Sequence, residues 1–80
     1  MKSKFSVDFF SDERYEYVTA EISYEGQILC QISQDKGKSN MLIEFFHEQR
    51  VLAKQPKMKF FVNDFLLLIE GVKNDLATYR

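Results

Sequence analysis

The spacing of apolar residues changes once along this chain, near residue 62, from every second residue to a helical stripe. Before that point, short segments alternate apolar and polar side chains, as half-buried β-strands do. Beyond it, the apolar residues Phe65, Ile69, Val72 and Leu76 recur at helical spacing. This order predicts an α+β fold, in which an antiparallel β-meander is followed by one C-terminal amphipathic helix packed on one face of the sheet.

Four segments carry the strand pattern: residues 3–10, 15–23, 27–33 and 40–47. A short stretch at 58–61 is an optional fifth strand, and the helix is expected over residues 62–78. The segment 40–47 is apolar on both faces, so we expect it to be central in the sheet or covered on both sides.

The turn between the second and third strands decides which side chains meet. A two-residue loop, Glu25–Gly26, would set polar side chains opposite apolar ones on each face. A three-residue loop that begins at Tyr24 joins apolar pairs only, namely Ile22 with Ile28, Ala20 with Cys30 and Val18 with Ile32. Register follows the buried face, and such a loop needs a left-handed last residue, which Gly26 supplies. We therefore predict the three-residue loop.

The length of the chain limits the depth of any site. With 80 residues, we expect a single domain, residues 1–80, whose core is one sheet and one helix thick. A grooved binding surface is easier to build on that scale than a deep catalytic cleft. One cysteine excludes an internal disulfide, and the longest apolar run, residues 65–69, is too short to span a membrane. No apolar run follows Met1–Lys4, so we expect no signal peptide and a cytoplasmic location.

The residue types that usually carry catalysis or metals are isolated in this sequence. His47 is the only histidine, and no cysteine lies near it at metal-ligand spacing, so we expect no metal site and no cofactor. Cys30 has apolar neighbours and is expected in the core rather than as a nucleophile. The acidic residues fall on predicted surfaces and turns, where nothing desolvates them. The sequence therefore predicts a binding protein and not an enzyme.

An acidic segment gives the clearest hint of a partner. Residues 8–25 are rich in acids and contain a single base, Arg14, although the net charge of the chain is only −1. Carboxylates next to tyrosines suit the recognition of a basic protein, because the rings supply contact area and the acids steer association. The predicted partner-binding residues are Asp8, Asp12, Glu13, Tyr15, Glu16 and Tyr17. The loop 35–40 is the next candidate, and a merely solvated surface is the plainer interpretation.

A resemblance to a known family rests on three segments and the closing helix. The segments are residues 20–27 (AEISYEGQ), 32–37 (ISQDKG) and 42–45 (LIEF), and the helix follows Phe61. Over about residues 5–76, the chain resembles small bacterial immunity proteins of contact-dependent growth inhibition and related polymorphic toxin systems. It departs from their usual pattern at the helix start, where Phe61 and Val62 replace a proline-containing entry. The resemblance implies a cytoplasmic inhibitor that binds and blocks one cognate toxin domain, often a nuclease, and it implies no catalytic residues.

Two other functions stay open on the sequence alone. A protein-binding adaptor or regulatory module fits the same composition. A nucleic-acid-binding protein would use the lysine and arginine side chains of segment 50–59. Aromatic residues that can stack on nucleobases lie next to them in the chain. The net charge of −1 disfavours this last function.

Overall fold

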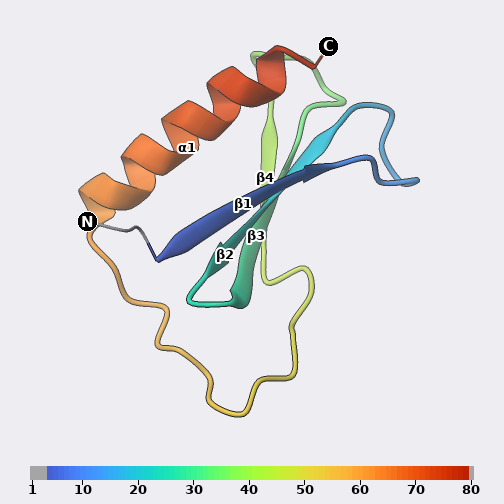
Figure 1. Ribbon diagram of the computed structural model, residues 1–80. Helices are drawn as coiled ribbons and strands as arrows, with labels where there is room; N and C mark the ends of the chain where they lie inside the picture. Colours follow the sequence, from blue (N-terminus) through green and yellow to red (C-terminus); the bar gives the residue numbers. More distant parts are fainter. Residues whose placement is uncertain (1–3, 80) are drawn as a thin grey trace.

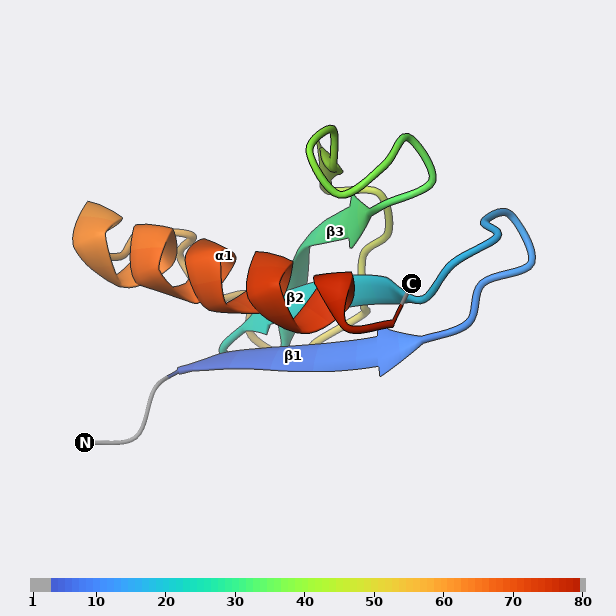
Figure 2. The same cartoon turned by 90° about the horizontal axis from the view of Figure 1, so that it is seen from above.

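A four-stranded antiparallel sheet and one helix make up the fold. The computed structural model describes residues 4–79, so Ser3, the expected first residue of the sheet, lies outside the described residues. The elements are β1 (Phe5–Phe10), β2 (Thr19–Tyr24), β3 (Gln27–Ser33), β4 (Leu42–Phe45) and α1 (Val62–Ala77). The strands lie in the order β1-β2-β3-β4, and α1 crosses one face of the sheet (Figures 1 and 2). The predicted α+β meander with one C-terminal helix is confirmed.

The strands differ from the prediction in their bounds and in number, and β4 covers only Leu42–Phe45 of the predicted 40–47. The second strand was expected from residue 15 but begins at Thr19. The backbone N–H groups of Glu16 and Tyr17 donate to the Asp35 carboxylate at 3.0 and 3.2 Å, so these residues form a loop instead of extending the ladder. Within residues 4–79 there is no fifth strand, because the segment 58–61 joins no ladder of the sheet.

The hairpin between β2 and β3 has a two-residue loop, so the predicted three-residue loop is wrong. Tyr24 is paired with Gln27, and the loop residues Glu25 and Gly26 have φ of 47° and 86°, as a type I′ turn requires. A β-bulge then shifts the register, so that Ile22 is paired with Cys30. The extra residue is on β3, and it restores the apolar face that an unbulged two-residue hairpin would have mixed.

The core lies between α1 and one face of the sheet. Cross-strand pairs such as Val7 with Ile22 and Ala20 with Ile32 place apolar side chains on this face. From the helix, Val72 and Leu76 are buried against it. Successive side chains of a strand point to opposite faces, so Asp8, Glu21 and Gln31 lie on the other side of the sheet. We call that side the helix-free face.

Strand β4 is an exposed edge of the sheet, and it is neither central nor covered on both sides as the sequence suggested. All of its residues are exposed, with Leu42 at 55% and Phe45 at 48%. The helix lies over β1 and β2 and does not extend its cover to β4, although the rings of Phe45 and Phe65 are 6.3 Å apart. The apolar residues on both faces of this strand therefore belong to an uncovered sheet edge, and not to a buried strand.

The long connection from β4 to α1 is fastened to the end of the hairpin. Figure 1 shows it passing around the turn between β2 and β3 before it reaches the helix. The Gln27 side chain accepts from the Arg50 N–H at 2.8 Å and donates to the Arg50 carbonyl at 3.0 Å. The Tyr24 hydroxyl donates to the Lys59 carbonyl at 3.4 Å. The Gln27 contacts therefore fasten the start of the connection to the hairpin, and the Tyr24 contact fastens its end, shortly before α1.

Candidate functional site

A hollow on the helix-free face gathers charged side chains from several parts of the chain. Its volume is about 360 Å³, and it is lined by Asp8, Phe10, Asp12, Arg14, Glu21, His47 and Glu48. Four of these side chains are carboxylates and one is a guanidinium. We call this set of residues the acidic hollow. Its residues come from β1, β2, the loop after β1 and the turn after β4, so only the folded chain assembles it.

The strand register explains how four polar side chains come to lie in one row. Asp8 of β1 is paired with Glu21 of β2, and Glu21 is paired with Gln31 of β3. Glu44 of β4 continues the row beside Gln31. Directly paired residues share a face of the sheet. The row crosses the whole sheet, with Glu21 near its middle.

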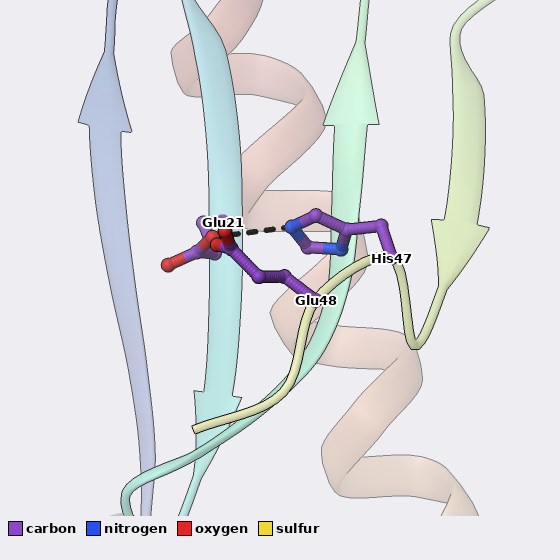
Figure 3. A group of neighbouring side chains, drawn as sticks. All are labelled: Glu21, His47 and Glu48. Atoms are coloured by element: carbon purple, nitrogen blue, oxygen red, sulfur yellow. Dashed lines mark hydrogen bonds and ion pairs between the residues drawn. The ribbon is translucent and has the colours of Figure 1, made fainter. Parts of the chain in front are cut away.

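A left-handed residue directs the chain back over the sheet after β4. Phe46 has a φ of 53°, which is uncommon for a residue with a bulky side chain. The chain reverses there, and His47 and Glu48 follow on the helix-free face, in front of the sheet in Figure 3 with α1 behind it. His47 was expected at the end of a strand, but β4 ends at Phe45, and the imidazole reaches across to β2.

Glu21 is the centre of a charged network. Its Oε2 lies 3.1 Å from His47 Nε2, and its Oε1 lies 3.6 Å from an Arg50 guanidinium nitrogen. The same guanidinium donates to Gly26 O at 2.9 Å and to Ser23 Oγ at 3.3 Å, which fixes its position. Only 13% of the Glu21 side chain is exposed. The expectation that no acid is desolvated is therefore wrong for Glu21, because His47 and Arg50 lie against it.

A second ion pair closes the other side of the acidic hollow. Arg14 donates to Asp12 from its side chain, with a shortest distance of 2.7 Å, and from its backbone N–H at 2.9 Å. These hydrogen bonds lower the pKa of the Asp12 carboxyl to about 2. Gln31 also lies near enough to Asp12 to lower this pKa slightly. Asp12 is thus ionised at neutral pH, with its charge largely compensated by Arg14.

The six residues predicted to bind a partner divide into two groups. Asp8 and Asp12 line the acidic hollow, and the other four lie in the adjoining loop. Glu13 and Glu16 are exposed, while the rings of Tyr15 and Tyr17 are half-buried. The Arg14 guanidinium lies over the Tyr15 ring at 5.7 Å. The loop 35–40, the next candidate, contributes Asp35, which fastens the backbone of Glu16 and Tyr17.

Sequence reasoning missed Glu21, His47 and Glu48 as members of one site. Glu21 entered the prediction as one acid of the acid-rich segment 8–25, and His47 only as an isolated histidine. Glu21 and His47 are 26 positions apart, so no spacing rule connects them. One feature of the sequence could have indicated their contact. The predicted second and fourth strands belong to one meander, so residues on them can share a face of the sheet.

Cys30 and the basic segment take no part in the acidic hollow. Cys30 is buried in the core cluster on the helix side of the sheet, and burial raises the pKa of its thiol to about 11. In the basic segment, Arg50 is turned toward Glu21, whereas Lys54, Lys57 and Lys59 are exposed.

Comparisons of the chain with protein-family models, with curated proteins and with solved structures found no match. Among residues 4–79, no helix is long and apolar enough to cross a membrane. The function must therefore be argued from the fold and the charges of this chain.

Proposed function

We propose that this chain is an inhibitor of the immunity type, which binds a basic bacterial toxin domain, such as a nuclease, and blocks it in the cytoplasm. The observation that carries the proposal is the acidic hollow, where four carboxylates and one guanidinium line a single concave surface. An anionic substrate demands a basic active site, and an acidic concave surface is complementary to it. The resemblance of the sequence to immunity proteins points the same way.

Acids held by ion pairs and exposed acids would serve such an inhibitor in different ways. Glu21 is held by His47 and Arg50, so it is already oriented for a lysine or arginine of the partner. Glu13 and Glu16 are exposed on the neighbouring loop, where they would attract a basic partner before contact. The half-buried rings of Tyr15 and Tyr17 lie beside them and would add contact area.

Association kinetics test the electrostatic part of the proposal. We expect the double variant Glu13→Lys/Glu16→Lys to associate with its toxin domain at least about tenfold more slowly at low ionic strength. The control is Glu70→Lys/Asp75→Lys, which changes the net charge equally but on α1, and it should slow association far less. Equal rates for the two variants would move the interface away from the acidic loop.

Calorimetry tests the proposal as a whole. The protein is titrated into a toxin C-terminal domain encoded immediately upstream of its gene, and the toxin activity is assayed in the same mixture. We expect one-to-one binding of about nanomolar affinity with loss of toxin activity. Binding without inhibition, or no binding, would contradict the immunity function.

A second candidate function, a protein-binding adaptor module, is favoured by the uncovered edge of the sheet. Leu42, Ile43, Phe45 and Phe46 are each more than 40% exposed on or next to β4. Exposed apolar patches and free strand edges are typical docking surfaces. An adaptor of this kind would lose its partner on Leu42→Lys but not on Glu13→Lys/Glu16→Lys, which is the reverse of the result expected for the inhibitor.

A further inference from the structure

We propose that Glu21, His47 and Glu48 form a binding site for a divalent transition-metal ion of the zinc class. One ligand atom from each residue lies within 4.8 Å of the other two (Figure 3). The sequence predicted no metal site, because Glu21 of β2 is 26 positions before His47 in the chain. The site lies in the acidic hollow and shares Glu21 with the proposed inhibitor surface, but its binding of an ion can be measured without any partner.

The distances are close to those that a bound ion requires. Zinc lies about 2.0–2.2 Å from nitrogen and oxygen ligands, so two ligands of a tetrahedral ion are about 3.3–3.5 Å apart. His47 Nε2 and Glu21 Oε2 are already 3.1 Å apart. Glu48 is exposed, so its side chain is free to move the remaining distance of about 1 Å toward them. Figure 3 shows its side chain extended toward the Glu21 carboxylate.

A buried polar side chain beside this site lacks the direct partners that such groups normally have. Gln31, paired with Glu21 on the same face, is 2% exposed, and its amide makes no direct hydrogen bond with any residue of 4–79, although it lies near enough to the Asp12 carboxyl to lower the pKa of that group. Unsatisfied buried polar groups often indicate an ion or its bound water. A water held on the ion would give the Gln31 amide a partner.

Arg50 supports the site from outside. It approaches Glu21 Oε1, while Oε2 faces His47, so the two oxygens have separate roles. Its bonds to Ser23 and Gly26 keep it there. Carboxylates that bind metals are usually oriented in this way by a second hydrogen-bonding partner. Asp8 lies beside Glu21 in the acidic hollow, outside the group of three ligands.

The ligand types select the class of ion. One imidazole with two carboxylates suits zinc and its first-row neighbours, whereas calcium and magnesium prefer oxygen ligands alone. Cys30, the only thiol of the chain, is in the core on the opposite side of the sheet, so it adds no sulfur ligand. When Nε2 binds the ion, the ring proton is on Nδ1.

Titration of the purified full chain with zinc chloride, followed by calorimetry at pH 7.5, tests the site. We expect one ion per chain, with micromolar or tighter affinity and with magnesium chloride binding far more weakly. Glu48→Gln should weaken zinc binding by at least about tenfold. Because Glu48 is exposed, this variant should fold normally, which circular dichroism checks. The matched control is Glu44→Gln, an exposed carboxylate on β4 outside the cluster, which should leave the affinity unchanged.

Nitrogen NMR of the single imidazole separates a true ligand from a nearby charge. On zinc addition, the Nε2 resonance of His47 should shift strongly, while Nδ1 keeps its proton. Absence of zinc binding would overturn the proposal. So would an affinity equal in the wild type, in Glu48→Gln and in His47→Gln, since the ion would then be bound elsewhere. Both readouts use zinc alone, so they fail or succeed independently of any toxin.

Discussion

Asp12 and Arg14 form an ion pair whose effect on pH dependence can be predicted. The hydrogen bonds from Arg14 lower the pKa of Asp12 from 3.8 to about 2. A carboxyl whose pKa is lower in the folded state stabilises the fold above its unfolded pKa, and it loses that contribution as the pH falls toward about 2. In Arg14→Gln, we expect the pKa of Asp12 to return toward 3.8, measured by carbon NMR of the side-chain carboxyl. The control Arg50→Gln should leave it unchanged, and an unchanged pKa in Arg14→Gln would show that Arg14 is not its cause.

The separate residues of the acidic hollow differ in how far the sequence could reveal them. Asp8 and Asp12 were predicted because acids cluster locally in the chain, and they line the hollow. Glu21 and His47 could not be joined by any local rule, because their contact depends on the turn at Phe46. A positive φ at phenylalanine is not encoded in spacing or composition. The contact between Glu21 and His47 therefore could not be predicted from the sequence.

Two glycines in different elements should respond to alanine in opposite directions. Gly71 lies in α1, exposed, and a Cβ added there would meet no atom within 4 Å. It therefore does not serve a close approach of helix and sheet, and Gly71→Ala should raise the free energy of unfolding by about 1 kcal/mol. Gly26 has a φ of 86° in the hairpin, so Gly26→Ala should lower it by about 1–2 kcal/mol. Urea denaturation measures both, and destabilisation by Gly71→Ala would contradict the open position.

For the hairpin of β2 and β3, the sequence predicted that the two strands share one apolar face, but it did not predict the loop length and the bulge that produce this face. An apolar face on β2 and β3 was rightly expected, and Ala20, Ile22, Cys30 and Ile32 do share the core. The chain achieves this with a tight two-residue loop and a bulge in place of a longer loop. Both arrangements bury nearly the same side chains. The pattern of apolar residues therefore does not distinguish them, and only the backbone geometry does.

The whole molecule carries different chemistry on its two sides. The helix-free face holds the acidic hollow, whereas the helix side holds the core and, beyond it, the exposed side chains of Ile43 and Phe45 on β4. Leu42, which is paired with Ser33, is on the helix-free face at the sheet edge, away from the acidic hollow. A basic partner and an apolar partner would therefore bind different surfaces. The inhibitor and adaptor functions can be separated by the surface that a partner protects.

This asymmetry also predicts how stability is distributed over the fold. All residues of β3 are buried, whereas all residues of β4 are exposed at the edge. The free energy of local opening is lowest where few apolar contacts are lost. We therefore expect β4 to open while the rest of the fold stays intact. In native-state hydrogen exchange, we expect amides of β2 and β3 to exchange only through global unfolding. Amides of β4 should be protected on the order of 100-fold less.

Protein concentration provides the control for this measurement. Protection of β4 equal to that of β3 at high concentration, falling on tenfold dilution, would mean that a second copy covers the edge. Equal protection at every concentration would contradict the gradient, because an uncovered strand with exposed side chains has too few contacts to hold its hydrogen bonds as firmly as the buried one. Low protection of β4 throughout would identify it as the part of the sheet that is free to pair with a partner.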